Sequence, residues 1–304
     1  MHSDPLPDHT ALLTTITTSY GVAPERLTFI PRGWVSAGYE LRTADRVYFV
    51  KLWLTPDDAA RAVARLPLVQ QLHAAGFRAR LPYPVEALDG SLSVPAAGGV
   101  AALLPFLPGT TPPGWPRWSD DVLDELGHVL TDLHAVKPSV ELPRDFSIAG
   151  LVPNERLAQL QDVVRRLPER FVVSHTDLIG DNLLVGADGR LSALDWDTAM
   201  LAPPEQDLAL LLHGEQPVDN RALRRVIAIY PRDVPLELDL FAFFMLRRYV
   251  ADYTARVIRL REPGLAVAEA AEAREGMVTW GSGQWSRLER TLALVEAVLV
   301  ERGA

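Results

Sequence analysis

The chain of 304 residues is 48% hydrophobic, which supplies enough apolar side chains for more than one core. Its formal charge of -9 at pH 7 argues against a general nucleic-acid binder, because affinity for phosphate backbones comes from clustered Lys and Arg. An acidic surface suits a cationic ligand better, although ordinary solubility is the simpler explanation of a charge of this size. The chain has no cysteine, which excludes disulfides, zinc–thiolate sites and thiol nucleophiles, so its chemistry must rest on carboxylates, His, Lys or hydroxyl groups.

Neither a secretory signal nor a membrane-spanning segment is predicted. The start of the chain carries acidic side chains instead of a basic region and lacks a sustained apolar run. The longest weakly polar stretch, residues 94–107, is interrupted by proline and glycine and is too short to span a bilayer. We therefore expect a cytoplasmic protein with no membrane or nucleic-acid partner, and the sequence leaves its oligomeric state open.

The first part of the chain, residues 1–106, is predicted to be rich in strands. Short runs of aliphatic and aromatic residues are separated by polar turns, and one longer amphipathic segment is interrupted by Pro67. The expected elements are strands at 27–30, 39–43, 47–53 and 100–104, a hairpin of 85–88 with 91–94 turning on Asp89-Gly90, and a helix over 56–75 that Pro67 kinks or splits.

The second part, residues 107–304, is predicted to be mainly helical. The segment 105–109 contains two prolines and a glycine, which continue neither a strand nor a helix and therefore predict a connection. Apolar residues recur at helical spacing in 120–135, after the N-cap Ser119, and in 241–260 and 291–300. The fold class is α+β, with a small antiparallel sheet in the first domain and helices in the second.

A polar segment between apolar runs follows at 174–197. The apolar runs 171–173, 183–185 and 191–194 predict strands, and Asp188-Gly189 predicts a turn between the last two.

That hairpin would bring two oxygen donors together. Asn182 precedes one strand and Asp195 follows the other, so pairing of the strands places them side by side, with Asp177 five residues before Asn182. Carboxylate and amide oxygens suit a hard cation such as Mg²⁺. Bound Mg²⁺ with a nearby carboxylate is what phosphoryl transfer requires.

The spacing of this segment matches the catalytic and metal loops of kinases. The pattern H-x-D-x-x-x-x-N is formed by His175, Asp177 and Asn182, and Asp195 follows a strand. Upstream, Lys51 ends the run Y-F-V-K, where the phosphate-binding lysine of that signature would lie. Alternatively, Lys51 protects an edge strand against aggregation.

The glycine-rich loop is the least typical part of the pattern. Residues 31–39 keep Gly33 and Gly38 but not the full G-x-G-x-x-G motif. Lying between two predicted strands, this loop can still present backbone N–H groups and the Ser36 hydroxyl to phosphates.

At these residues the sequence resembles the aminoglycoside phosphotransferases and choline-kinase-like enzymes, which share a reduced protein-kinase-like fold of two lobes. The resemblance covers most of the chain and is greatest to the spectinomycin branch, through Y-F-V-K-L, the loop 175–186, and D-W-D leading to M-L-A-P. It implies an enzyme that transfers the γ-phosphate of ATP or GTP to a hydroxyl of an aminoglycoside- or aminocyclitol-like acceptor, with Mg²⁺ as cofactor.

The resemblance also implies roles for individual residues. Asp177 is the base, and Asn182 and Asp195 are the metal ligands. The phosphate-binding lysine is Lys51, and Asp207 anchors the catalytic loop. The remaining assignments are His175 as structural support, Gly33, Ser36, Phe106 and Leu107 as nucleotide contacts, and Asp197 as a further metal contact or loop support.

Two departures from the family pattern stand out. Kinases pair the strand lysine with a helix Glu, yet no Glu occurs between Glu40 and Glu86. Either Asp57 or Asp58 substitutes for it, or neither reaches and Lys51 is held only by the nucleotide. In addition, His175 is followed by Thr176, where many antibiotic kinases have Gly.

The acceptor is the least specified part of the prediction. Trp280 and Trp285 are candidates for stacking on a cationic ring, or alternatively pack beneath a loop, and Asp181 is either a substrate contact or a solvated acid. A metabolic kinase for choline, homoserine or a sugar has the same phosphate-binding pattern. A nucleotide-binding regulator without catalysis is the alternative from another class. A protein kinase is disfavoured because Asp207 follows Asp195 after only twelve residues, which leaves no room for an activation loop.

Overall fold

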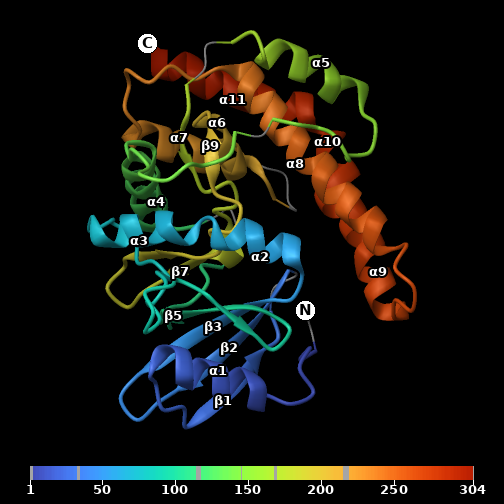
Figure 1. Ribbon diagram of the computed structural model, residues 1–304. Coiled ribbons are helices and arrows are strands. Elements are labelled where there is room, and N and C mark those ends of the chain that lie inside the picture. The colour runs from blue at the N-terminus through green and yellow to red at the C-terminus, as the bar shows by residue number, and fades with distance from the viewer. Residues whose placement is uncertain are drawn as a thin grey trace. The chain divides into compact units, whose positions relative to one another are not determined.

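The computed structural model describes residues 3–32, 35–113, 118–144, 146–167, 170–214 and 219–303. The chain forms two compact units (Figure 1). Unit 1 comprises Met1–Thr110, Pro138–Leu142 and Asn182–Ala199, and unit 2 comprises Thr111–Lys137, Pro143–Asp181 and Met200–Ala304. Compared with the predicted boundary after residue 106, unit 1 therefore takes in two later segments.

Unit 1 is built on a five-stranded antiparallel sheet. The strand order is β1-β2-β3-β5-β4, so β3 lies at the centre and is paired along both edges. Gly38 in β2 lies opposite Lys51, and a Cβ at Gly38 would meet the Phe49 ring at 2.6 Å, so a larger residue there would force that ring to shift. The strands are β1 (Arg26–Ile30), β2 (Ser36–Arg42), β3 (Val47–Trp53), β4 (Val94–Ala96) and β5 (Gly99–Pro105).

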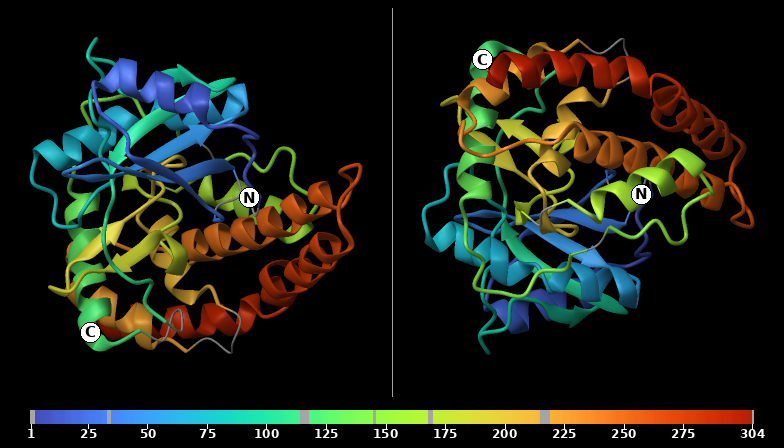
Figure 2. Two further views of the ribbon diagram at one scale, coloured as in Figure 1. Left: turned by 90° about the horizontal axis from the view of Figure 1, so that it is seen from below. Right: turned by 90° about the horizontal axis from the view of Figure 1, so that it is seen from above.

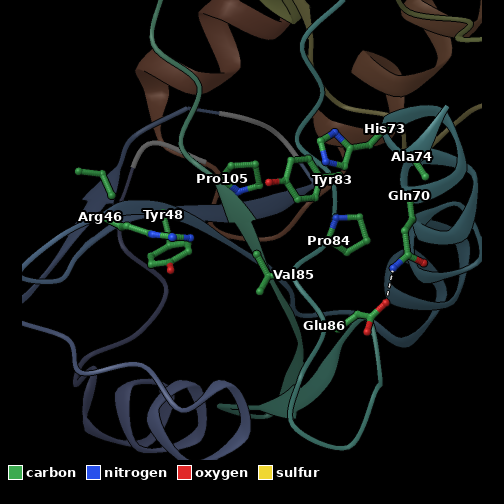
Figure 3. A pocket seen from close by; sticks show the side chains of 11 residues that line it. Arg46, Tyr48, Gln70, His73, Ala74, Tyr83, Pro84, Val85, Glu86 and Pro105 are labelled. Atoms are coloured by element: carbon green, nitrogen blue, oxygen red, sulfur yellow. Dashed lines mark hydrogen bonds between the residues drawn. The ribbon is translucent and has the colours of Figure 1, made fainter. Parts of the chain in front are cut away.

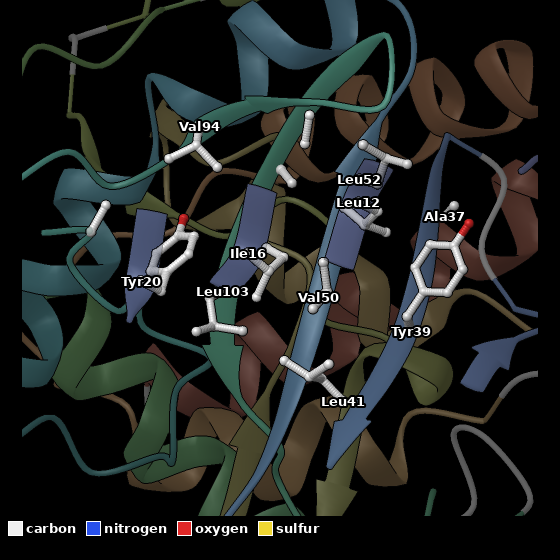
Figure 4. Packing of buried hydrophobic residues seen from close by; sticks show 13 residues of the cluster. Leu12, Ile16, Tyr20, Ala37, Tyr39, Leu41, Val50, Leu52, Val94 and Leu103 are labelled. Carbon is white, nitrogen blue, oxygen red and sulfur yellow. The ribbon is translucent and has the colours of Figure 1, made fainter. Parts of the chain in front are cut away.

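The two faces of this sheet have different coverings. Helix α1 (Thr10–Tyr20) packs Leu12 and Ile16 onto one face, against Val50 and Leu52 of β3 (Figure 4). Because successive side chains of a strand point to opposite faces, Lys51 is directed to the other face. That face contacts α2 and α3 through a second core of Trp53, Ala59, Ala62, Leu66, Ala102 and Leu104.

The segment predicted as one interrupted helix is two helices, α2 (Pro56–Val63) and α3 (Leu66–Ala74). Thr55 caps α2 by accepting the backbone N–H of Asp58 with its side chain, and Pro56 occupies the first turn, where a missing N–H costs little. Pro67 lies in the first turn of α3. The proline therefore splits the segment, as predicted.

The hairpin predicted over 85–94 does not form. The turn is present, because Ala87 N–H donates to the Ser91 carbonyl at 2.8 Å, but the flanking residues form no strand pair. Instead, Val85 N–H donates to the carbonyl of Leu103 in β5 at 2.8 Å. The observed hairpin is β4–β5, which turns at Ala97-Gly98 with φ of 48° and 80°, the conformation of a tight two-residue hairpin turn.

A second, small sheet in unit 1 confirms the other predicted hairpin. Strands β7 (Leu183–Val185) and β8 (Leu191–Ala193) pair antiparallel, with Leu183 opposite Ala193. The turn contains Gly189 at a φ of 78°, a conformation that glycine adopts at little cost.

Unit 2 is mainly helical and contains one short strand pair, β6 (Val172–Ser174) with β9 (Met200–Ala202). Its longest helix, α8 (Leu238–Arg259), contacts α5, α6 and α11; Figure 2 shows it from two further sides, in orange. The cap predicted for α4 is confirmed, because the Ser119 side chain accepts the Val122 N–H. The other helices are α4 (Asp120–His134), α5 (Glu155–Val164), α6 (Glu205–Leu208), α7 (Arg221–Ile229), α9 (Val267–Gly276), α10 (Gly283–Trp285) and α11 (Leu288–Gly303), with a π-helix, η3, at Met277–Ser282.

These elements confirm the predicted α+β class, with an antiparallel sheet early in the chain and helices later. Within the described ranges, no helix is both long enough and apolar enough to cross a bilayer.

Candidate active site

Lys51 of β3 is the centre of a charged cluster in unit 1. Its Nζ lies 2.8 Å from Asp195 Oδ1 and 2.9 Å from Asp197 Oδ1. The second carboxylate is also held by Trp53, whose indole Nε1 donates to Asp197 Oδ2 at 2.7 Å. One strand thus supplies both partners of Asp197, because Lys51 and Trp53 share the same face of β3.

The electrostatics of this cluster favour a permanently charged lysine. Burial by itself lowers the pKa of Lys51, but the attraction of Asp195 and Asp197 outweighs it and the pKa is raised. Burial also raises the pKa of Asp197, an effect that the nearby Lys51 charge opposes and the Asp195 charge reinforces. Lys51 therefore offsets part of the negative charge of two carboxylates that lie close together.

The β7–β8 hairpin positions the other oxygen donors. Leu194 N–H donates to the Asn182 carbonyl at 2.8 Å, which places Asn182 beside the residue that precedes Asp195. The Asp195 backbone has a φ of 58°, and buried Trp196 donates to the Ala193 carbonyl at 2.9 Å. This left-handed turn ends the hairpin and directs the chain into the D-W-D sequence.

No acid of α2 pairs with Lys51. Asp58 accepts the Thr55 hydroxyl at 2.6 Å and forms an ion pair with Arg61, so it serves the start of its own helix. Asp57 is exposed, and among the described residues no ion pair joins it to Lys51. The expectation that Asp57 or Asp58 replaces the missing Glu is therefore wrong; the lysine is held by the D-W-D acids.

In unit 2, Asp207 holds the backbone at His175 and Thr176, in the loop that the sequence predicts to be catalytic. Its Oδ2 accepts the N–H of His175 at 3.0 Å and its Oδ1 accepts the N–H of Thr176 at 2.7 Å. His134 Nε2 lies 3.1 Å from the same Oδ2. These are the contacts that an anchor for this loop needs, and the loop buries His175 completely.

Burial alone raises the pKa of Asp207, but the His134 hydrogen bond, the His134 and His175 charges and the Thr176 N–H lower it below its ordinary value. The carboxylate is thus kept ionised, which strengthens its bonds to the loop. The backbone of Thr176 is strained, because its φ of 71° is unusual for a β-branched residue.

Asp177 follows this anchored pair and contacts an arginine that we did not predict. Arg248 Nη1 lies 2.6 Å from Asp177 Oδ1, and Arg248 Nε lies 3.0 Å from Asp252 Oδ2. The sequence signal was available, since Arg247-Arg248 interrupts an otherwise apolar stretch of α8, where charged residues are rare unless they are paired.

The predicted aromatic candidates lie on partly buried surfaces of unit 2. Trp280, in the π-helix, stacks on His213 with ring centroids 5.2 Å apart, and Trp285 contacts Tyr253 at 5.0 Å. Burial, reinforced by the Arg248 and Arg256 charges, lowers the pKa of His213 to about 3, so this ring is neutral. π-helical turns are frequent at functional sites.

Comparison with protein families decides the classification. Residues 26–241, more than half of the chain, match the family described as phosphotransferase enzyme family, or APH. The chain belongs to this APH phosphotransferase family. The predicted resemblance is thereby confirmed, and the protein is an enzyme.

Solved structures confirm the kinase-like fold. Spectinomycin phosphotransferase APH(9)-Ia, solved with ADP and spectinomycin, is 18% identical with a TM-score of 0.72, over 98% of this chain and 100% of that one. Amicoumacin kinase hAmiN, solved with AMP-PNP and Ca²⁺, is 16% identical with a TM-score of 0.70, covering 90% and 93%. Choline kinase LicA from Streptococcus pneumoniae is 14% identical with a TM-score of 0.63, covering 93% and 97%. No curated protein sequence matches significantly.

The donor atoms in unit 1 of this APH phosphotransferase fit a hard cation. Asp195, Asp197 and Asn182 offer oxygen only, and the Asp195 side chain is 51% exposed. The described residues contain no group of three His, Cys, Asp or Glu that by itself would hold a metal. Such a site suits Mg²⁺, which is commonly held by one or two carboxylates together with substrate phosphates.

The remaining predicted nucleotide contacts are only partly described. Ser36 begins β2, opposite Trp53, and Gly33 lies outside the described residues. Phe106 and Leu107 are half-buried, and Phe106 N–H donates to the β3 carbonyl of Val47 at 3.3 Å.

A cavity of about 590 Å³ also occurs in unit 1, away from these groups (Figure 3). The Tyr83 and His73 rings stack on one side with centroids 3.5 Å apart, and Gln70 donates to Glu86 at 2.6 Å. None of the predicted site residues lines this cavity.

Proposed function

We propose that this phosphotransferase moves the γ-phosphate of ATP or GTP to a hydroxyl of an aminoglycoside- or aminocyclitol-like acceptor. The observation that supports this most directly is the Lys51 cluster, where one lysine holds both acids of the D-W-D sequence in a chain of the APH family. Such a cluster combines a phosphate-binding cation with oxygen donors for a metal.

In this proposal unit 1 binds the donor. Asn182 and Asp195 hold Mg²⁺, and Asp197 supports it or keeps Lys51 in place. The metal, when bound, neutralises charge on the phosphates. Lys51 binds phosphate oxygens with its ammonium group, while Ser36, Gly33, Phe106 and Leu107 contact the nucleotide.

Asp177 acts on the acceptor. Its carboxylate accepts a hydrogen bond from the acceptor hydroxyl and takes the proton as the new oxygen–phosphorus bond forms. The bond between the γ-phosphorus and the β–γ bridging oxygen breaks, and the nucleoside diphosphate leaves with that electron pair. Asp207 maintains the loop backbone before Asp177, so its contribution is positional.

The acceptor class rests on the partly buried aromatics of unit 2 and on the likeness to spectinomycin phosphotransferase. The likeness to a choline kinase favours a metabolic alternative, in which choline, homoserine or a sugar is phosphorylated. The phosphate-binding residues would be the same in either case.

A coupled assay of nucleoside-diphosphate release tests the proposal. With Mg²⁺ and ATP or GTP, we expect turnover that depends on one member of a panel of spectinomycin, other aminocyclitols, choline, homoserine and sugars. Asp177→Ala should lower kcat by about 10²–10⁴-fold with little change in nucleotide affinity.

Asp162→Ala, which removes an exposed carboxylate elsewhere in unit 2, is the matched control and should keep wild-type turnover. Equal losses of kcat and nucleotide affinity in Asp177→Ala would contradict the role of Asp177 as base. Nucleotide binding without turnover on any acceptor would favour the non-catalytic regulator.

A further inference from the structure

Arg248 joins two carboxylates in unit 2. Its guanidinium donates to Asp177 through Nη1 at 2.6 Å and to Asp252 through Nε at 3.0 Å. The arginine and Asp252 lie one helical turn apart on α8, so the helix itself fixes that bond. Asp177 is the third member and comes from a different segment of the chain.

Arg248 stays protonated and positively charged. Burial by itself lowers the pKa of this guanidinium, but Asp252 and Asp177 outweigh that effect and raise the pKa above its ordinary value. The side chain is 27% exposed. An arginine in this setting remains a fixed positive charge beside the proposed base.

The geometry of the bond restricts the carboxylate. Arg248 binds Oδ1 of Asp177, so a proton that arrives on Oδ2 leaves the ion pair intact. A planar guanidinium presents its donors in a rigid fork, so this bond also limits rotation of the carboxylate. Arg248 therefore restrains the position and the orientation of the Asp177 carboxylate.

The acids beside Asp177 are already compensated by cations. Asp252 contacts Arg248 and also Arg256, whose Nη1 lies 3.9 Å from Asp252 Oδ1 and donates to the Asp252 carbonyl at 2.9 Å. The nearby His213 is neutral. Among the residues that the structure describes in this cluster, two carboxylates face two guanidinium groups, so the cluster itself carries no net negative charge to hold an ammonium group.

Arg248 still has donors to offer. A guanidinium has five N–H groups, and its hydrogen bonds to Asp177 and Asp252 use two of them. An oxygen of the acceptor can accept one of the others.

We propose that Arg248 is a positioning residue for Asp177 and a specificity residue that selects acceptors carrying an oxygen, not an ammonium group, next to the reacting hydroxyl. This inference rests on the proposed function and narrows it, because any cationic group of the acceptor then lies away from the hydroxyl that is phosphorylated. The neighbouring oxygen is an ether, carbonyl, hydroxyl or carboxylate.

The positioning role is tested with Arg248→Met, Arg248→Lys and Arg248→Ala on the acceptor that the wild type phosphorylates best. We expect Arg248→Met to lower kcat by about 100-fold, the loss typical of a misplaced catalytic group, while the KM for the nucleotide changes less than about twofold. Arg248→Lys should recover part of the loss, and added guanidinium ion should partly rescue Arg248→Ala. A structural defect alone would not respond to either.

Arg247→Met is the matched control, because Arg247 is the adjacent residue on α8 and donates to the Ser147 carbonyl at 3.1 Å. Its kcat should stay within about threefold of wild type. A wild type that phosphorylates no acceptor would refute the proposed function, and this inference with it. An active wild type with an equally active Arg248→Met would refute this inference alone.

The specificity role is tested with a matched pair of small acceptors, 1-amino-2-propanol and 1,2-propanediol, which differ in the group beside the secondary hydroxyl. We expect the wild type to prefer the diol in kcat/KM, and Arg248→Met to shift the ratio towards the amine by about tenfold, the effect of about 1.4 kcal/mol. An unchanged ratio would overturn the specificity role.

Discussion

Each unit of the molecule has a cation that holds two carboxylates at the candidate active site, and the two cations differ in kind. In unit 1, Lys51 on a strand contacts Asp195 and Asp197. In unit 2, Arg248 on a helix contacts Asp177 and Asp252. A lysine ammonium is a compact point charge on a flexible stem, whereas a guanidinium is a rigid fork.

This difference indicates two uses of the same charge pattern. The ammonium group of Lys51 can exchange its carboxylate partners for phosphate oxygens without a strict geometry. The guanidinium of Arg248 keeps a carboxylate in one orientation, which suits a group that must meet a hydroxyl. The comparison is consistent with the proposals that Lys51 binds the phosphate donor and that Arg248 positions Asp177 for the acceptor.

Lys51→Met is expected to have the largest effect, and it tests the phosphate-binding role of the lysine. Loss of a preorganised cation at the phosphates should lower kcat/KM for the nucleotide by about 10²–10³-fold. Steady-state kinetics with varied ATP measure this loss. The chain has only one other lysine, exposed Lys137, so Lys137→Met is the control, and equal losses in both variants would contradict the role of Lys51.

Glu205 is a buried acid that forms no ion pair with the described lysine and arginine side chains, so it extends the comparison. Burial raises the pKa of Glu205 to about 7, although the Glu237 N–H donates to it at 2.8 Å. The folded state therefore binds more protons than the unfolded chain between about pH 4.5 and 7, and stability falls as pH rises through that range. The full shift corresponds to about 3 kcal/mol.

Glu205→Gln should remove this loss, so the variant gains stability relative to wild type as pH rises from 4.5 to 8. Urea unfolding across that range measures the difference. The wild-type curve alone is not sufficient, because the lowered pKa of His213 gives the opposite slope below pH 6.5. Exposed Glu289→Gln should keep the wild-type slope.

The smallest expected effect concerns backbone strain, which occurs in both units. Thr176 in unit 2 has a φ of 71°, and Ala97 in unit 1 has a φ of 48°. Thr176→Gly should raise the free energy of unfolding by about 1 kcal/mol, net of the entropy that glycine adds to the unfolded chain. Ala97→Gly should gain less, since alanine is not β-branched. Thermal unfolding that shows destabilisation in Thr176→Gly would contradict strain at this residue.

Much of unit 1 and of the catalytic segment was predictable because local signals agreed with the final packing. The β7–β8 hairpin follows from two aliphatic runs around Asp188-Gly189, and it fixes Asn182 near Asp195. The split between α2 and α3 follows from Pro67. These features depend on residues that are neighbours in the sequence.

Other features depend on long-range pairing and were missed for that reason. Residues 85–94 contain a turn, but Val85 pairs with Leu103 of β5, a choice that no local pattern reveals. Similarly, the partners of Lys51 come from a segment 144 residues later, and Arg248 meets Asp177 across 71 residues. Side-chain partners at such separations are set by the tertiary fold.

Asp207 accepts hydrogen bonds from the main-chain N–H groups of His175 and Thr176. Every amino acid except proline has that N–H group, so these hydrogen bonds do not depend on the side chain at either position. The shape of the loop can therefore be kept while the side chains at positions 175 and 176 change. Thr176, whose φ of 71° is unusual for a β-branched residue, is held in this way.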